Sequence, residues 1–230
     1  MDIFYSNNIN DNIIELSASE SHHCMKVMRK KRGDLVIVLD GNGCRYIATI
    51  IEVDKKNILL EIKNKDKIPQ NTMKLHLIIS PTKSHDRIDW LIEKATEIGV
   101  TKISFLGCEH SERRKINLDR LKKKAISALK QCQNLWLPEI NNIQSFEQFI
   151  TSTNHNEGKY IAYVNADRNL HLLTASKEFP GHLILIGPEG DFTGDEVDAA
   201  INHGFKPVSL GLNTLRTETA GLVACTLLNS

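Results

Sequence analysis

The sequence predicts an α/β protein with a small N-terminal β domain and a larger domain built on a parallel sheet. First, three short β-branched segments separated by turn-forming residues lie between residues 35 and 62. Second, continuous apolar segments alternate with amphipathic helical segments from residue 75 onward, as in a parallel sheet covered on both faces. Third, 230 residues with 41% hydrophobic content are enough for two unequal domains.

Residues 1–68 form the predicted N-terminal domain, a small antiparallel barrel or sandwich. The turns are expected at residues 41–43 and 54–56, and the strands at residues 35–40, 44–53 and 57–62. A helix is expected before them, because Cys24, Val27 and Met28 recur at helical spacing and Gly33 is a natural stop.

Residues 72–230 form the predicted α/β domain, after a polar linker that contains Pro69. Helices are expected at residues 85–98, ending at Gly99, and at residues 118–135. The expected strands of this sheet are residues 75–80, 102–106, 160–164, 182–187 and 207–211. Ligands in such sheets gather at the carboxyl ends of the strands, so this domain is expected to hold the functional site.

One glycine loop follows the strand that ends near residue 187. Gly187 and Gly190 bracket Pro188 and Glu189 in the stretch LILIGPEGDFTGDEV, and glycines let the backbone turn and let a flat ligand approach. Thr193 and Glu196 have capping-box spacing, so a helix should start near residue 195 and end before Gly204. Dinucleotide-binding and P-loop patterns are absent, and a tight connection without a ligand is the alternative.

A second glycine loop lies in SLGLNTLRTETAGLVACTLL, near the end of the chain. An apolar helix is expected from Ala220 to Leu228, with Thr217, Glu218 and Thr219 at its start, where they need no catalytic role. Arg216 directly precedes this buried helix, so its guanidinium must reach solvent, a carboxylate or a ligand.

Composition and charge exclude several classes of protein. No apolar segment approaches the roughly 20 residues that span a bilayer, and the first residues do not resemble a signal peptide, so a cytoplasmic protein is expected. Five cysteines without ligand spacing predict reduced thiols and no metal site. The net charge is only +1, but basic residues cluster at positions 26–32 and 113–124, where they form either solvated faces or a surface for RNA or DNA.

Three stretches together resemble the ribosomal RNA small-subunit methyltransferase E family. The C-terminal stretch IGPEGDFTGDEVDAAINHGFKPVSLGLNTLRTETA is similar to the family pattern I-G-P-E-G-G-F-x-x-x-E, G-F and S-L-G-x-x-x-L-R-x-E-T-A. Upstream, TKSHDRIDWLIEKATEIGVTKISFL and HHCMKVMRKKRGDLVIVLDGNG resemble the family's K-x-x-E-x-G-V and H-x-x-x-V-x-R-x-x-x-G-D segments. The resemblance covers nearly the whole chain in order.

The resemblance implies a PUA-like RNA-binding domain joined to a SPOUT methyltransferase domain with a C-terminal trefoil knot. It further implies a homodimer formed through the knot domain that uses S-adenosylmethionine to methylate N3 of one uridine in 16S rRNA. Arg216 would then stand at the methyl group or the target base, with Glu218 as base or orienter, although a helix cap or a partner of Arg216 is an equal alternative. The residues implied to bind the methyl donor are Gly187, Pro188, Glu189, Gly190, Leu210, Gly211, Asn213 and Leu215.

RNA contacts are expected from the basic clusters and from one loop lysine. These residues are Arg29, Lys30, Arg32, Lys83, Arg113 and Arg114, with a surface salt bridge as the alternative for Lys83. The chain departs from the family pattern at Asp191, a common glycine position, and at His110 and Asn134, where arginine is frequent. Two other functions stay open, a SPOUT methyltransferase acting on a ribose hydroxyl or on tRNA, and a non-catalytic RNA-binding or assembly protein.

Overall fold

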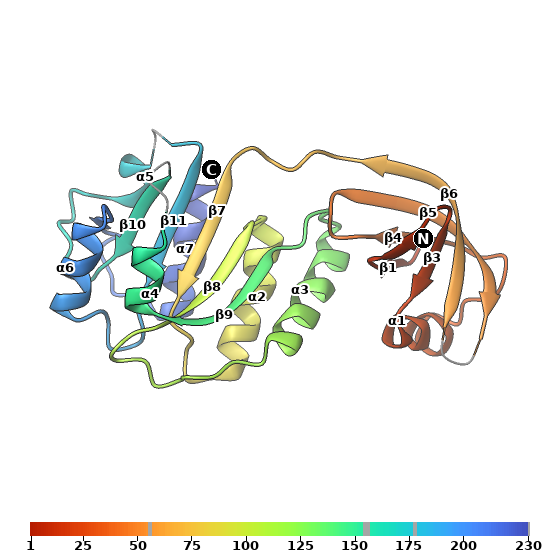
Figure 1. Ribbon diagram of the computed structural model, residues 1–230, viewed down its shortest axis with the longest axis horizontal. Coiled ribbons are helices and arrows are strands. Elements are labelled where there is room, and N and C mark those ends of the chain that lie inside the picture. Colours follow the sequence, from red (N-terminus) through yellow and green to blue (C-terminus); the bar gives the residue numbers. More distant parts are fainter. Residues whose placement is uncertain (55–56, 154–156, 177–178, 230) are drawn as a thin grey trace. The chain divides into compact units, whose positions relative to one another are not determined.

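A computed structural model describes residues 1–54, 57–153, 157–176 and 179–229 (Figure 1). The chain divides into two compact units. The first comprises Met1–Gln70 and Ile126–Leu137, and the second comprises Asn71–Ala125 and Pro138–Ser230. Helix α3 (Leu118–Cys132) therefore contributes to both units.

The first unit contains one open six-stranded sheet. Alternate side chains of β5, from Cys44 to Ile50, are buried, as the period of a strand with one covered face requires. The three expected strands, now β4, β5 and β6, pair antiparallel as predicted. The sheet is a half-barrel in which β2 and β3 are also antiparallel, and only the β1–β4 pair among the described strands is parallel. In sheet order the strands are β1 (Ile3–Tyr5), β4 (Leu35–Leu39), β5 (Cys44–Val53), β6 (Ile58–Lys67), β3 (Ile13–Leu16) and β2 (Asn8–Asn10). The turn expected at 54–56 includes residues 55 and 56, which lie outside the described residues.

The helix expected around Cys24 has a different geometry. An α-helix, α1 (Ala18–His22), continues into a π-helical turn, η1 (His23–Val27). The wider π turn shifts the phase of the side chains, so residues three or four apart no longer share one face. Cys24 is buried, whereas Val27 and Met28 are exposed, and the prediction of one apolar face was wrong for these two residues.

Gly43 is closely surrounded within the first unit. Its φ is +90°, and a Cβ there would lie 2.3 Å from Cζ2 of Trp136 and 2.7 Å from the carbonyl oxygen of Ile68. We expect Gly43→Ala to lower the free energy of unfolding by roughly 2–5 kcal/mol, because backbone strain and overpacking add. Gly33 is a matched control, since its φ is +94° but a Cβ would meet nothing within 4 Å.

Urea unfolding followed by circular dichroism measures both variants. Gly33→Ala should cost only the left-handed backbone penalty of roughly 1–2 kcal/mol. Equal losses for the two alanine variants would contradict the close packing around Gly43.

The second unit contains a six-stranded sheet in which every neighbouring pair is parallel. All six residues of its central strand β11 are buried, as expected for a sheet covered on both faces. The predicted fold class is confirmed. In sheet order the strands are β12 (Lys206–Val208), β10 (Gly158–Ala162), β11 (Gly181–Ile186), β7 (Lys74–Ile79), β8 (Lys102–Gly107) and β9 (Glu139–Ser145).

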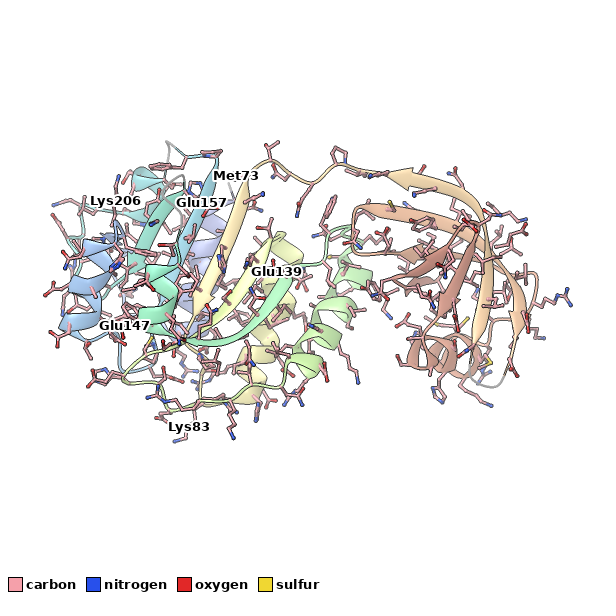
Figure 2. All side chains as sticks on the ribbon, viewed as in Figure 1. Met73, Lys83, Glu139, Glu147, Glu157 and Lys206 are labelled. Atoms are coloured by element: carbon pink, nitrogen blue, oxygen red, sulfur yellow. The ribbon has the colours of Figure 1, made fainter. Side chains whose placement is uncertain are left out.

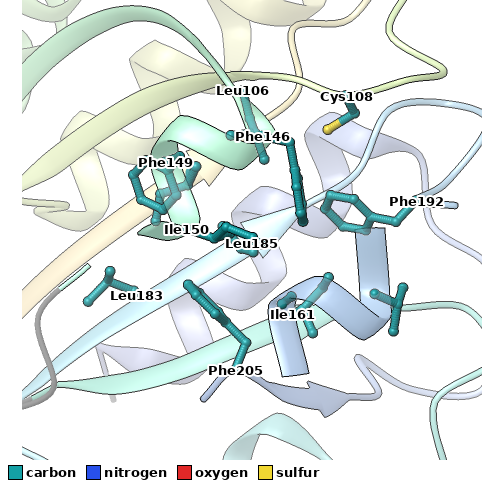
Figure 3. Packing of buried hydrophobic residues seen from close by; sticks show 13 residues of the cluster. Leu106, Cys108, Phe146, Phe149, Ile150, Ile161, Leu183, Leu185, Phe192 and Phe205 are labelled. Atoms are coloured by element: carbon teal, nitrogen blue, oxygen red, sulfur yellow. The ribbon is translucent and has the colours of Figure 1, made fainter. Parts of the chain in front are cut away.

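Helices cover the two faces of this sheet (Figure 1). On one face, α2 (His85–Ile98) and α7 (Thr217–Leu228) pack against each other, and a Cβ at Gly221 of α7 would lie 2.9 Å from Cδ1 of Ile79. On the other face, α4 (Phe146–Thr151) and α6 (Gly194–Asn202) enclose a core of buried residues. Four phenylalanines of that core gather around Leu185 (Figure 3).

The boundaries of the helices follow their capping residues. Helix α2 ends at Gly99, whose φ is +90°, as predicted. Thr193 and Glu196 form the predicted capping box of α6. Strand β9, helix α4 and the short helix α5 (Leu172–Ala175) were not predicted from the sequence.

The last part of the chain returns from the edge of the sheet to its centre. Strand β12 is an edge strand, yet α7, which follows it, packs on the central strands β7 and β11. The segment between them, residues 209–216, bridges back to the loop after β10, since the Ser209 amide donates to Leu170 O and Ser209 O accepts from the Leu172 amide.

Candidate functional site

The loops that follow the parallel strands meet at one edge of the second sheet and hold one another in place. The Lys83 amide, after β7, donates to Glu189 Oε1 at 3.2 Å, and the Glu109 amide, after β8, donates to Glu196 Oε1 at 2.9 Å. Figure 2 shows Lys83 beyond the end of β7 that is opposite Met73. These hydrogen bonds fix the loops at the carboxyl end of the sheet relative to one another, at the edge where ligands of such sheets bind.

A cavity of about 390 Å³ lies among the loops after β10, β11 and β12. Backbone groups, apolar side chains and a few charged groups line it, which is typical of a small-molecule site. The lining residues are Ala162, Tyr163, Val164, Arg168, Ile186, Gly187, Pro188, Glu189, Asp191, Val208, Ser209, Leu210, Gly211, Leu212, Asn213, Thr214, Leu215, Arg216, Thr217 and Ala220.

Seven of the eight residues expected to bind a methyl donor line this cavity, and Gly190 does not. A Cβ at Gly190 would lie 3.2 Å from the His110 Cβ, so this glycine allows His110 to approach the loop. A Cβ at Gly187 would lie 3.1 Å from the Phe192 ring, so Gly187 makes room for a buried phenylalanine. Close packing therefore requires both glycines, Gly187 against Phe192 in the same loop and Gly190 against His110 from the loop after β8.

Two departures from the family pattern, Asp191 and His110, meet at this loop. Asp191 has a φ of +59°, and its carboxylate accepts from the Phe192 amide at 2.9 Å and from the Val164 amide at 3.2 Å. His110 Nδ1 lies 3.0 Å from Gly190 O and 3.1 Å from Asp191 O, and donates to them. The Asp191 side chain therefore ties two walls of the cavity together, while His110 holds the same loop from outside.

Gly211 occupies the loop after β12 with a φ of +131°, which side chains of L-residues rarely adopt. Its amide donates to Ser209 Oγ at 3.2 Å. A Cβ at Gly211 would meet nothing within 4 Å, so the backbone conformation, and not crowding, requires glycine here.

Arg216 is the N-cap residue of α7, and its exposed side chain lines the cavity. Within the described part of the chain it has no hydrogen bond or ion pair from its guanidinium. A cation without a partner at the wall of a cavity is available to a ligand.

Glu218 lies in the first turn of α7 but is not among the residues that line the cavity. Its carboxylate is buried, with Oε1 3.6 Å from Nε of Arg87 on α2. Oε2 has no hydrogen-bond partner among the described residues. The contact with Arg87 joins the start of α7 to α2.

Removing Arg87 should leave the buried Glu218 carboxylate without its cation. We expect Arg87→Met to lower the free energy of unfolding by roughly 1–2 kcal/mol, a value discounted because Arg87 is partly exposed. Glu218→Gln in the same chain should recover part of this loss. A double-mutant cycle in urea measures the coupling, and Lys63→Met, at the exposed pair with Glu61, is the control. Additive losses would contradict an interaction between Arg87 and Glu218.

Most residues expected to contact RNA have protein partners. Arg113 donates to the carbonyl oxygens of Thr82 and Lys83, and Arg114 donates to Glu109 O at 3.2 Å. Lys83 forms an exposed salt bridge with Glu112. Lys30 forms a partly buried salt bridge with Asp2, and the hydrogen bond between them raises the pKa of Lys30. Arg29 and Arg32 are exposed and, within the described residues, have neither a side-chain hydrogen bond nor an ion pair.

Cys108 follows β8 at the carboxyl end of the sheet and is buried. Burial raises the pKa of the Cys108 thiol, after β8, well above its usual range, so the thiol stays protonated at neutral pH. No group of three or more His, Cys, Asp or Glu residues in this part of the chain could hold a metal ion. Nor does any described helix have the length and apolar character to cross a bilayer.

The sequence patterns did not predict one wall of the cavity, the segment after β10. Tyr163, Val164 and Arg168 follow β10, where no glycine pattern marks a ligand loop. The position of this segment at the carboxyl end of a parallel strand was the available signal.

Comparison with known proteins gives the class of this chain. Residues 69–229 match the RNA methyltransferase domain family, and residues 16–63 match the RNA methyltransferase PUA domain family. The ribosomal RNA small subunit methyltransferase E of Buchnera aphidicola is 31% identical over 223 residues, which cover 94% of this chain and 87% of that protein.

Solved structures agree with this result. The chain has a TM-score of 0.85 and 37% identity with a probable rRNA-methyltransferase from Porphyromonas gingivalis, covering 98% of this chain and 95% of that one. It has a TM-score of 0.86 and 27% identity with ribosomal RNA small subunit methyltransferase E from Neisseria gonorrhoeae bound to S-adenosylmethionine, again over 98% and 95%. The fold and the matched domains define an RNA methyltransferase. The chain belongs to the ribosomal RNA small subunit methyltransferase E family, as the resemblance of its motifs indicated.

Proposed function

We propose that this protein transfers a methyl group from S-adenosylmethionine to N3 of a uridine in 16S rRNA. The observation that supports it most is the cavity at the carboxyl ends of β10, β11 and β12, with Arg216, which has no side-chain partner among the described residues, at its wall. A family member with this fold, from Neisseria gonorrhoeae, binds S-adenosylmethionine.

The residues present fit such a donor. The loops of residues 187–189 and 210–215 present backbone groups and the apolar side chains of Leu210 and Leu215 to the cavity, which suits a flat adenine ring. Gly211 gives the second loop, which lines the cavity, a backbone conformation that L-residues rarely adopt. When bound, S-adenosylmethionine supplies a methyl group activated by a sulfonium.

Arg216 is proposed to act on the uridine. The N3–H of uracil is a poor nucleophile until its proton leaves, and negative charge then spreads onto the flanking carbonyl oxygens. A guanidinium already in place stabilises that charge as it develops. Glu218 is proposed as a positioning residue instead of a base, because it is buried against Arg87 and lies off the cavity lining.

The proposal extends to the partners of the protein. Arg29 and Arg32 are proposed to bind the phosphate backbone of 16S rRNA through the PUA-like unit, because they are exposed cations without partners among the described residues. A homodimer through the second unit is proposed, and Trp90 on α2, which is 40% exposed, is an apolar side chain available for it. The five cysteines are free, which suits the reducing cytoplasm where ribosomal subunits are assembled.

The test is transfer of tritiated methyl groups from S-adenosylmethionine to purified 30S subunits, naked 16S rRNA, 23S rRNA and tRNA taken from cells that lack this modification. Label in 16S rRNA, as the subunit or naked, is the expected result. Label in tRNA or 23S rRNA alone would contradict the proposal that 16S rRNA is the substrate. RNA binding without any transfer or donor binding would indicate the non-catalytic alternative.

A further inference from the structure

The cavity contains a second cation whose role the proposed reaction does not explain. Arg168 lines the same cavity as Arg216, and it too is exposed and has no hydrogen bond or ion pair among the described residues. Two arginines therefore line one small cavity.

The carboxylates that line this cavity already have partners. Both oxygens of Asp191 accept backbone amides, from Phe192 and Val164, and Glu189 Oε1 accepts the Lys83 amide. Neither carboxylate forms an ion pair with an arginine within the described residues. The arginines are thus left to attract an anionic or strongly hydrogen-bond-accepting ligand.

The backbone around Arg168 is held at both ends. On one side, the Val164 amide donates to Asp191 Oδ2. On the other, the segment at residues 170–172 exchanges backbone hydrogen bonds with Ser209 at 2.9 and 3.1 Å. The Leu170 amide also donates to Asp167 O at 2.9 Å, which closes the turn that contains Arg168. A guanidinium on an anchored turn loses less conformational entropy on binding than one on a free loop.

We infer that Arg168 binds the carboxylate of the methionyl part of S-adenosylmethionine. This inference rests on the proposed function. The carboxylate is the one anionic group of the donor, and a guanidinium matches its two oxygens in a fork. With Arg168 bound to the donor, Arg216 remains available for the oxygens of the uridine. The two arginines then have separate roles, Arg168 in donor binding and Arg216 in charge stabilisation.

The test compares two ligands that differ only in this carboxylate. Calorimetry measures the binding of S-adenosylmethionine and of decarboxylated S-adenosylmethionine to the full-length protein, to Arg168→Met and to Arg168→Lys. The parent should bind the carboxylated ligand roughly 10- to 100-fold more tightly, as expected for a charged hydrogen-bonded pair. Arg168→Met should bind both ligands equally, and Arg168→Lys should recover part of the preference.

Lys102→Met is the matched control, because Lys102 is at the amino end of β8 and is not a lining residue. It should keep the parent's preference. If Arg168→Met also keeps the preference for the carboxylated ligand, the inference is overturned. A rise in the KM for RNA in that variant would then assign Arg168 to an RNA phosphate. If the parent binds neither ligand, the proposed function fails first, which is a distinguishable result.

Discussion

The Arg216→Met protein should methylate RNA roughly 100- to 1000-fold more slowly than the parent, the usual loss when one preorganised donor to a developing oxyanion is removed. Its affinity for S-adenosylmethionine should stay within about twofold, because the proposed contact forms with the uridine and strengthens in the transition state. Its unfolding should be unchanged, since Arg216 is exposed and lacks partners among the described residues. Single-turnover rates with saturating RNA measure the effect on kcat.

Two variants make this result specific. Arg216→Lys keeps a charge but loses the planar fork, so its rate should fall between those of the parent and Arg216→Met. Lys102→Met, at the other end of the sheet, should keep the parental rate. An Arg216→Met protein with the parental rate would remove Arg216 from the mechanism.

Gly211→Ala should weaken the binding of S-adenosylmethionine by tenfold or more. A φ of +131° strains an L-residue, and the free energy of that strain sets the expected loss of affinity. The new Cβ meets nothing within 4 Å, so the loop can relieve that strain only by leaving the conformation that shapes the cavity. Calorimetric titration with the donor measures the loss.

Gly204 provides the control for strain alone. It also has a positive φ, +85°, with open space for a Cβ, but it follows α6 and does not line the cavity. Gly204→Ala should lower the free energy of unfolding by roughly 1–2 kcal/mol and leave donor binding intact. Equal weakening of binding in both variants would show that a general loss of stability, and not the loop at Gly211, is responsible.

The strongest local signals in the sequence were enough to predict the main elements of the second unit. Helix α2 was predicted with its observed ends, because an amphipathic repeat ends at a glycine in the left-handed conformation. The start of α6 followed from Thr193 and Glu196, since a capping box is a local interaction. The parallel sheet followed from apolar segments that are buried on both faces.

Other elements depend on contacts that a local pattern does not contain. Strand β9 has the sequence EINNIQS, with few apolar residues, because it is an edge strand. The π-helical turn after α1 changed the face on which Val27 and Met28 lie. Helical spacing alone could not reveal this change.

The candidate site was predicted in part. The glycine loops predicted most of two walls, and Arg216 was identified because a cation before a buried helix needs a partner. The third wall, with Arg168, came from the folding of the chain after β10, about twenty residues upstream of the first glycine loop. The hydrogen bond from the Val164 amide to Asp191 is likewise a tertiary contact. The sequence could therefore show Asp191 only as a departure from the family pattern, without its role in the loop.

The measurement that tests the central claim most directly is nucleoside mass spectrometry of 16S rRNA after incubation of unmodified 30S subunits with the protein and S-adenosylmethionine. The account predicts one new nucleoside, 3-methyluridine, whose amount depends on Arg216. A 2′-O-methylated nucleoside, or no methylated product from a protein that binds the donor, would contradict it.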